Sequence, residues 1–124
     1  MGYIIFMWEV EYTDEFEQWW NGLGEGEQDA VDRVVLMLMK AGPALGRPYV
    51  DTIEGSTHPH MKELRAQHGG DPYRVLFAFD PRRSAILLVG GNKGGDKRWY
   101  ARMIPIADRL YEEHLEELRK EGLI

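Results

Sequence analysis

Apolar and polar positions in the middle of the chain predict three successive β-strands. The pattern begins near Leu64, continues through residues 73–80, and ends with an apolar run at 85–89. The segments between these strands, 68–72 and 80–83, contain the glycine, proline and aspartate residues that favour chain reversals. The pattern therefore predicts an antiparallel meander.

The N-terminal part of the chain predicts one strand and two helices. Residues 3–12 are dense in β-branched and aromatic side chains, which favours a strand with one solvent-facing side. Apolar residues at helical spacing then predict a short helix, for which Thr13 supplies a capping hydroxyl. A second helix is expected over 27–41, and Gly42 and Pro43 end it. The apolar stripes of both helices are typical of packing against a sheet.

The remaining segments predict a loop and a C-terminal helix. Residues 43–60 show no clear period, so we expect an irregular connection there. Residues 99–121 have helical spacing, but Pro105 cannot donate a helical hydrogen bond. We expect the main helix to begin at Pro105, with 99–104 forming a separate turn or a kinked lead-in. The length of 124 residues predicts a single domain over 1–124.

Composition excludes several classes of site. The chain has no cysteine, which rules out disulfides, thiol nucleophiles and cysteine zinc sites. No apolar run approaches the roughly 18 residues that cross a bilayer, and the first residues lack the basic segment and cleavage site of a secretory signal. We therefore expect a cytoplasmic protein with no membrane partner.

The distribution of charge is more informative than the net charge of −6. Residues 58–109 carry ten basic side chains against five acidic ones, whereas the rest of the chain carries five against sixteen. The basic region is typical of a site for an anionic partner, although acidic residues also simply cover solvent-facing helices.

Four segments and the order of the predicted elements carry a family resemblance. The segments are MKELR, YRVLFAFDPRR, ILLVGGNKGG and IPIADRLYEEHL. They resemble the RelE/ParE superfamily of bacterial toxins, and in particular the HigB branch, which includes phage Gp49-like proteins. The resemblance covers nearly the whole chain. It implies a small α+β, RelE-like domain with a mainly antiparallel sheet, two N-terminal helices packed on it and a C-terminal helix.

The resemblance also implies a function. Such proteins are toxins of type II toxin-antitoxin systems, held inactive by a cognate antitoxin that usually has a helix-turn-helix domain. Active members of the mRNA-interferase branch enter the ribosomal A site, where the 2′-hydroxyl of the RNA attacks the adjacent phosphate without a metal or another cofactor. We therefore expect an mRNA endoribonuclease with ribosome and mRNA as partners.

Two alternatives keep the same fold. ParE-like members poison gyrase by binding it, and a degenerate toxin would only bind its antitoxin. The acidic net charge makes the second alternative credible, because many relatives are strongly basic and RNA binding depends on cations.

Three cations are candidates for the catalytic site. Arg74 is embedded in an otherwise apolar strand, a costly place for a charge, and it matches the strand arginine that related toxins use on the phosphate. A salt bridge to a helix carboxylate is the alternative. Lys93 follows the last strand, where the resembling proteins carry catalytic or RNA-binding groups. Arg65 is expected to contact phosphate or ribosomal RNA, and a solvated surface arginine is equally consistent.

Strand alternation separates two of the basic side chains. Lys62 and Arg65 fall on opposite faces of their strand. Leu64 is expected in the core, which would turn Arg65 to an open face together with Met61 and Glu63. Lys62 is nevertheless a candidate for RNA binding.

The loop after the last strand and the start of the C-terminal helix supply the remaining candidates. Lys97 is a further RNA-binding cation, and Trp99 and Tyr100 have the ring type that stacks on nucleobases. The spacing of Tyr100 also fits a core position. We expect no metal site, because the histidines near the sheet lack an accompanying carboxylate pattern. These histidines are His58, His60 and His68. The general base stays unassigned.

Overall fold

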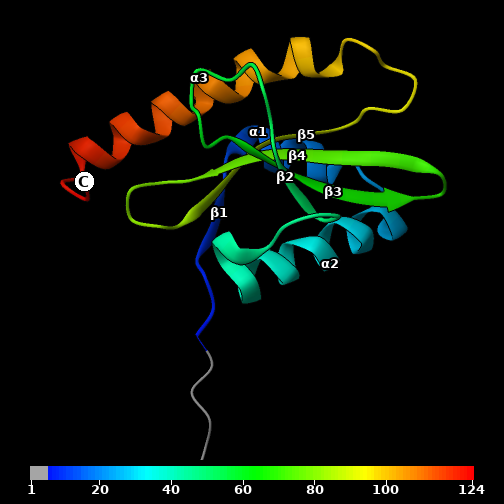
Figure 1. Ribbon diagram of the computed structural model, residues 1–124, viewed down its shortest axis with the longest axis horizontal. Helices are drawn as coiled ribbons and strands as arrows, with labels where there is room; N and C mark the ends of the chain where they lie inside the picture. Colours follow the sequence, from blue (N-terminus) through cyan, green and yellow to red (C-terminus); the bar gives the residue numbers. More distant parts are fainter. Residues whose placement is uncertain (1–5) are drawn as a thin grey trace, which may run out of the picture.

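The computed structural model describes residues 6–124 as one five-stranded sheet with helices on both faces (Figure 1). The elements are, in chain order, β1 (Val10–Tyr12), α1 (Asp14–Asn21), α2 (Glu25–Ala41), the 3₁₀ helix η1 (Gly42–Ala44), β2 (Val50–Thr52), β3 (Lys62–His68), β4 (Asp71–Phe79), β5 (Ala85–Asn92) and α3 (Trp99–Lys120). The strand order is β1-β5-β4-β3-β2. Strand β1 runs parallel to β5, and every other pair is antiparallel. The α+β class and the expected meander are confirmed.

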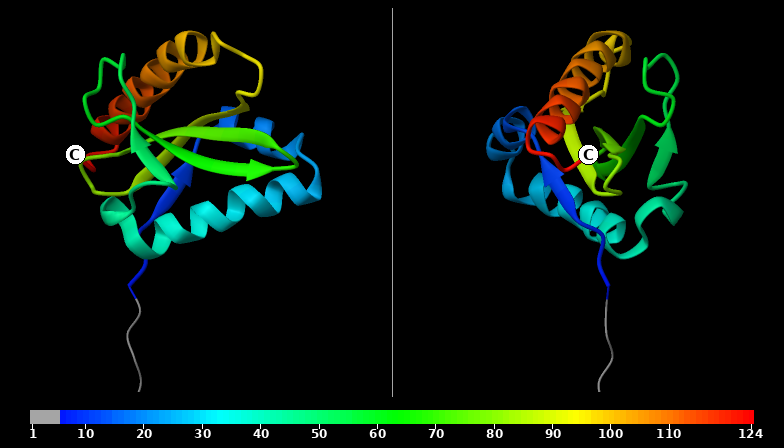
Figure 2. Two further views of the ribbon diagram at one scale, coloured as in Figure 1. Left: turned by 45° about the vertical axis from the view of Figure 1, so that its right-hand side comes forward. Right: turned by 90° about the vertical axis from the view of Figure 1, so that its left-hand side faces the viewer.

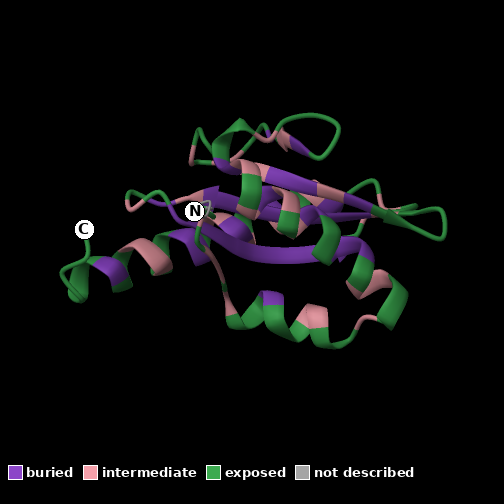
Figure 3. Ribbon diagram, turned by 90° about the horizontal axis from the view of Figure 1, so that it is seen from below, coloured by how far each residue is buried: buried purple, intermediate pink, exposed green. Residues whose placement is uncertain are grey.

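The turn residues and the alternation of side chains along the strands both favour the meander. Gly69 and Gly70 both have positive φ angles, 59° and 84°, which suit the two-residue turn between β3 and β4. Along β4, Tyr73 and Val75 pack toward α1 and α2, whereas Leu76 packs toward α3. Each face of the sheet therefore has its own apolar layer, and Figure 2 shows α2 and α3 on opposite sides of the sheet. Figure 3 shows that the buried residues lie mainly in the sheet and on the helix faces that cover it.

Two adjacent glycines in β5 let both layers approach the sheet closely. A Cβ atom on Gly90 would lie 2.3 Å from the ring of Trp19 in α1. A Cβ atom on Gly91, which points to the other face, would lie 2.4 Å from Nε1 of Trp99 at the start of α3. The glycines thus let the end of α1 and the start of α3 pack closely on the sheet.

The start of α1 is attached to the sheet by one residue. The backbone N–H of Phe16 donates to the Thr13 hydroxyl at 3.0 Å, which caps the helix as expected. The same hydroxyl donates to the carbonyl of Leu88 in β5 at 2.6 Å. The cap therefore also sets the position of α1 over the sheet.

Three expectations about the elements were wrong. The N-terminal strand covers only Val10–Tyr12, since residues 6–9 are not in a strand and residues 1–5 lie outside the described part. The segment 43–60 contains η1 and β2, which pairs with β3. Helix α3 runs without interruption through Pro105. Both Pro105 and Ala101, whose carbonyl loses its helical donor, are exposed, so water can satisfy that carbonyl.

None of the helices in residues 6–124 combines the length and the apolarity needed to cross a lipid bilayer.

Candidate functional site

A buried carboxylate on the α3 face of the sheet collects several of the candidate residues. Glu63 in β3 has a side chain that is 5% exposed. The hydroxyl of Tyr100 in α3 donates to both of its oxygens, at 2.8 and 3.1 Å. The Nε atom of Arg74 in β4 lies 3.0 Å from Oε1, and Nε of Arg65 in β3 lies 3.3 Å from the same atom. Three elements thus meet at one carboxylate.

Arg74 is the most buried of these cations. It is 8% exposed, and its Nη1 donates to the carbonyl of Tyr73 at 3.0 Å. Its Nε has no aligned hydrogen-bond acceptor, although Glu63 is within ion-pair distance, so that contact is electrostatic rather than a well-formed hydrogen bond. The expected alternative of a helix carboxylate is wrong, because Arg74 pairs with a carboxylate of the neighbouring strand.

Arg65 lies directly opposite Arg74 in the β3–β4 register, so two positive charges are adjacent on one face. The Glu63 carboxylate and Asp51 of β2 compensate them, with Asp51 Oδ2 at 3.2 Å from Nη2 of Arg65. A hydrogen bond from Arg47, together with the charge of Arg65, lowers the pKa of Asp51 despite partial desolvation. Arg65 keeps a side-chain exposure of 34%, so it is the accessible arginine of the pair.

Lys93 and Tyr100 are both partly exposed and contact each other. The Nζ atom of Lys93 lies 5.5 Å from the centroid of the Tyr100 ring. Burial and the hydrogen bond to Glu63 raise the pKa of Tyr100, and the nearby Arg74 only partly offsets them. Tyr100 therefore stays a neutral hydrogen-bond donor at physiological pH.

The other candidates lie away from this cluster. By strand alternation Lys62 shares the opposite face with Leu64, which packs among residues of α1 and α2. Lys97 is exposed in the loop before α3. Trp99 is only 2% exposed, so its ring is not accessible to a nucleobase. The open face expected for Met61 and Glu63 was wrong, because α3 covers that face and both residues are buried.

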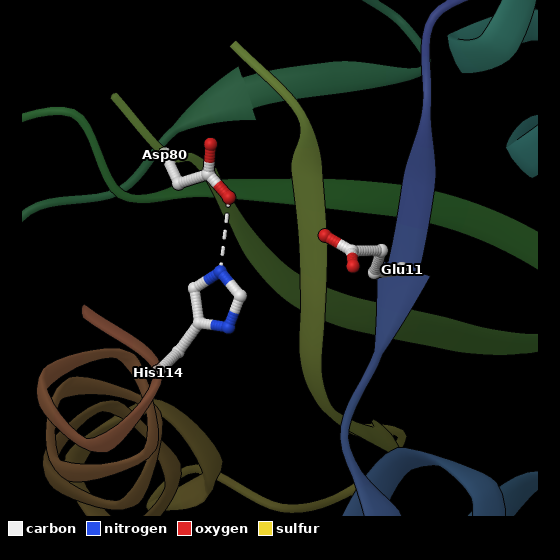
Figure 4. Close-up of side chains that lie close together, drawn as sticks. All are labelled: Glu11, Asp80 and His114. Atoms are coloured by element: carbon white, nitrogen blue, oxygen red, sulfur yellow. Dashed lines mark hydrogen bonds and ion pairs between the residues drawn. The ribbon is translucent and has the colours of Figure 1, made fainter. Parts of the chain in front are cut away.

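Another carboxylate–histidine cluster lies at the far end of the sheet. Glu11, Asp80 and His114 each offer a ligand atom within 4.8 Å of the others, from β1, the end of β4 and α3 (Figure 4). The Nε2 atom of His114 lies 2.9 Å from Asp80, whose side chain is fully buried. The guanidinium of Arg82 donates to both carboxylates, so it already supplies the positive charge that a bound cation would bring.

The histidines that the sequence singled out do not meet. His58 lies 3.0 Å from Glu112 of α3, whereas His60 and His68 are exposed at separate places. The residue that the sequence analysis missed is Glu63. The sequence did contain a signal for Glu63, because Glu63 and Arg65 are two positions apart and must therefore share one face of their strand.

Comparisons with known proteins identify relatives of the chain. Residues 18–112 match the family described as phage derived protein Gp49-like (DUF891). The chain is 45% identical over 111 residues to the candidate toxin HigB2 of Mycobacterium tuberculosis, covering 86% of this chain and 55% of HigB2. It is 47% identical over 102 residues to the candidate toxin HigB3 of the same organism, covering 82% of this chain and 88% of HigB3. The chain therefore spans about half the length of one relative and most of the other.

Solved structures share the fold. A mutant of the E. coli toxin RelE in the free state aligns with a TM-score of 0.56 at 10% identity, over 90% of this chain and 98% of that one. The RelE chain of the archaeal RelE–RelB complex from Pyrococcus horikoshii OT3 aligns with a TM-score of 0.52 at 17% identity, over 71% and 97%.

Proposed function

Because the chain belongs to the phage-derived Gp49-like family, as a HigB-like member of the RelE toxin superfamily, we propose that it is the toxin of a type II toxin-antitoxin system and that it cleaves mRNA on the ribosome. The observation that carries this proposal is the meeting of Arg65, Arg74 and Tyr100 at Glu63 on one sheet face, with Lys93 beside them. Cations and proton-transfer groups are the two requirements of phosphodiester cleavage by a neighbouring hydroxyl.

The reaction that suits this site is attack of the RNA 2′-hydroxyl on its own 3′-phosphate. A new P–O2′ bond forms and the P–O5′ bond breaks, which gives a cyclic phosphate and a 5′-hydroxyl. Arg65 and Lys93, which are partly exposed, would balance the charge that builds on the phosphate oxygens. Arg74, which is buried, would add its positive charge to theirs.

Glu63 and Tyr100 are suited to the proton transfers. A phosphate bound to Arg65 would compete with Glu63 for the guanidinium and would so free a lone pair of the carboxylate. Glu63 would then accept the 2′-hydroxyl proton. Tyr100, which stays protonated, would donate toward the leaving 5′-oxygen.

The partners follow from the same proposal. The archaeal RelE neighbour is in complex with RelB, and we infer that this chain likewise has an antitoxin, one with a helix-turn-helix domain. Ribosome and mRNA would be its targets in the cytoplasm. Of the remaining candidates, Lys97 and Lys62 would contact RNA only outside the Glu63 cluster.

Controlled expression in a bacterial host tests the proposal. Wild-type protein should stop incorporation of labelled methionine and shorten cellular messages, whereas Arg65→Ala, Lys93→Ala and Tyr100→Phe should each restore growth. Arg109→Ala, about two and a half turns along α3 from Tyr100, is the matched control and should stay toxic. Induction of a DNA-damage reporter with intact messages would instead indicate gyrase poisoning. Normal growth of cells that express the wild-type protein would indicate that the chain only binds its antitoxin.

A further inference from the structure

A cavity of about 530 Å³ is lined by residues of α2, of the segment before β2, and of β3 and β4, and it shares Arg65 and Arg74 with the Glu63 cluster. Its volume is in the range of sites that hold small molecules. The lining residues that matter for its chemistry are Arg33, Met37, Tyr49, Arg65, Gln67 and Arg74. Arg65 thus borders both the cavity and the Glu63 cluster.

The charge of this cavity is opposite to that of the chain. Three arginines and no carboxylate are found among its described lining residues, although the chain has 21 acidic and 15 basic side chains. A second cavity, of about 390 Å³, is lined instead by Glu17 and Asp32 and also contacts α2. These two cavities therefore differ in the charged side chains that line them. Glu63 and Asp51 compensate two of the arginines, but Arg33 is not compensated within the described part of the chain, and it suits the first cavity to an anion.

Two of the three arginines of the cavity, Arg33 and Arg65, keep donor capacity. Arg33 is exposed and forms none of the ion pairs found within residues 6–124. Arg65 is paired with Glu63 and Asp51 but is one-third exposed, so a phosphate can still reach it, whereas the buried Arg74 is paired with Glu63 and is not a free donor. Guanidinium groups with free N–H donors bind phosphate oxygens strongly.

Tyr49 supplies an aromatic surface at the same place. Its backbone is fixed, because its N–H donates to Gly46 at 3.1 Å and its carbonyl accepts from the N–H of Arg65 at 2.8 Å. Tyr49 lines the cavity and is 39% exposed. A partly exposed ring held by a rigid backbone, with the thioether of Met37 also in the lining, is suited to stack on a nucleobase.

We propose that this cavity is a nucleotide-binding subsite for single-stranded RNA, in which a base stacks on Tyr49 and its flanking phosphates contact Arg33 and Arg65. The inference rests on the proposed function, because the RNA would pass from this subsite over Arg65 to the Glu63 cluster. It adds Arg33 and Tyr49 as substrate-positioning residues, and it explains why an acidic protein can hold a polyanion at one place.

Binding of a fluorescein-labelled, fully 2′-O-methylated RNA hexamer, measured by anisotropy, tests the subsite without cleavage. Arg33→Gln and Tyr49→Leu should each weaken binding about fivefold to tenfold, and Tyr49→Phe should bind like wild type. Lys40→Gln, an exposed cation of α2 outside the cavity, and Tyr12→Leu, an exposed tyrosine of β1, are the controls. Arg33→Gln should also reduce the slope of log K against log salt by about 0.7.

The outcomes separate this subsite from the cleavage reaction. The subsite is overturned if wild type does not bind the hexamer, or if the Arg33 and Tyr49 variants bind it as tightly as their controls, even when wild type cuts mRNA. Binding that depends on Arg33 and Tyr49, in a protein that never cuts mRNA, would uphold the subsite and reject the proposed reaction.

Discussion

Replacing Glu63 by glutamine tests the electrostatic core of the site. The substitution keeps the size of the side chain and an oxygen that can accept from Tyr100, but it removes the charge that compensates Arg74. Arg74 has a side-chain exposure of 10%, so water can replace little of the lost interaction. Removing one partner of a buried ion pair costs about 3–5 kcal/mol. Because the amide keeps part of the hydrogen bonding, we expect a loss of about 3 kcal/mol in the free energy of unfolding.

Urea denaturation followed by circular dichroism measures this loss. With a slope of about 2 kcal/mol per molar urea, the midpoint of Glu63→Gln should fall by about 1.5 M. Glu116→Gln, which removes an exposed carboxylate paired with Arg119 on α3, should change the stability by less than about 0.5 kcal/mol.

A double mutant separates the ion pair from other effects. Replacing Arg74 by methionine in the Glu63→Gln background removes the uncompensated charge, so the double variant should be about 2 kcal/mol more stable than Glu63→Gln alone. A loss below about 1 kcal/mol in the single variant, or a double variant no more stable than it, would refute the reasoning.

Three further predictions concern other parts of the molecule. Gly91→Ala should lower the free energy of unfolding by about 1–3 kcal/mol in urea, because its Cβ would lie 2.4 Å from Trp99; equal stability would contradict the close packing. For Asp80, burial alone would raise the pKa, but hydrogen bonds from a neighbouring arginine and histidine outweigh it and hold the pKa below 3.8. Its contribution is present above pH 3.8 and is lost as the pH falls through the folded-state pKa. The thermal midpoint of wild type should therefore drop more steeply below pH 4 than that of Asp80→Asn, and parallel curves would count against this. Burial and the hydrogen bond to Glu63 raise the pKa of Tyr100 above 10.0. In a pH titration followed by tyrosinate absorbance at 295 nm, Tyr100→Phe should therefore remove one of the tyrosines that ionise at the highest pH. An unchanged high-pH part of the titration curve would contradict the buried, hydrogen-bonded position of the Tyr100 hydroxyl.

The meander could be predicted because its determinants are local. Alternation along β4 and the reversing residues at 68–72 both depend on short stretches of sequence. The parallel pairing of β1 with β5 and the short strand β2 could not, since each depends on contacts with distant residues. The predicted start of the C-terminal helix at Pro105 was wrong, because packing of α3 on the sheet outweighs the loss of one helical hydrogen bond.

Part of the candidate site could be predicted because it also depends on local sequence patterns. The cost of a cation in an apolar strand directed attention to Arg74, which is buried and paired with Glu63, and alternation predicted the separation of Lys62 from Arg65 that the structure has. The place of Glu63 depended on α3 folding back over a face that looked open from the strands alone. Trp99 lies in the core because Gly91 leaves room for its ring, a pairing between residues that no local pattern connects.

A reconstituted translation reaction tests the central claim most directly. Purified protein is added with ribosomes present or absent, and the 5′ ends of the message are mapped for wild type, Arg65→Ala and Lys93→Ala. Our account predicts cuts that require ribosomes and that disappear in both variants. An intact message with normal translation, or cuts that persist unchanged in the two variants, would contradict it.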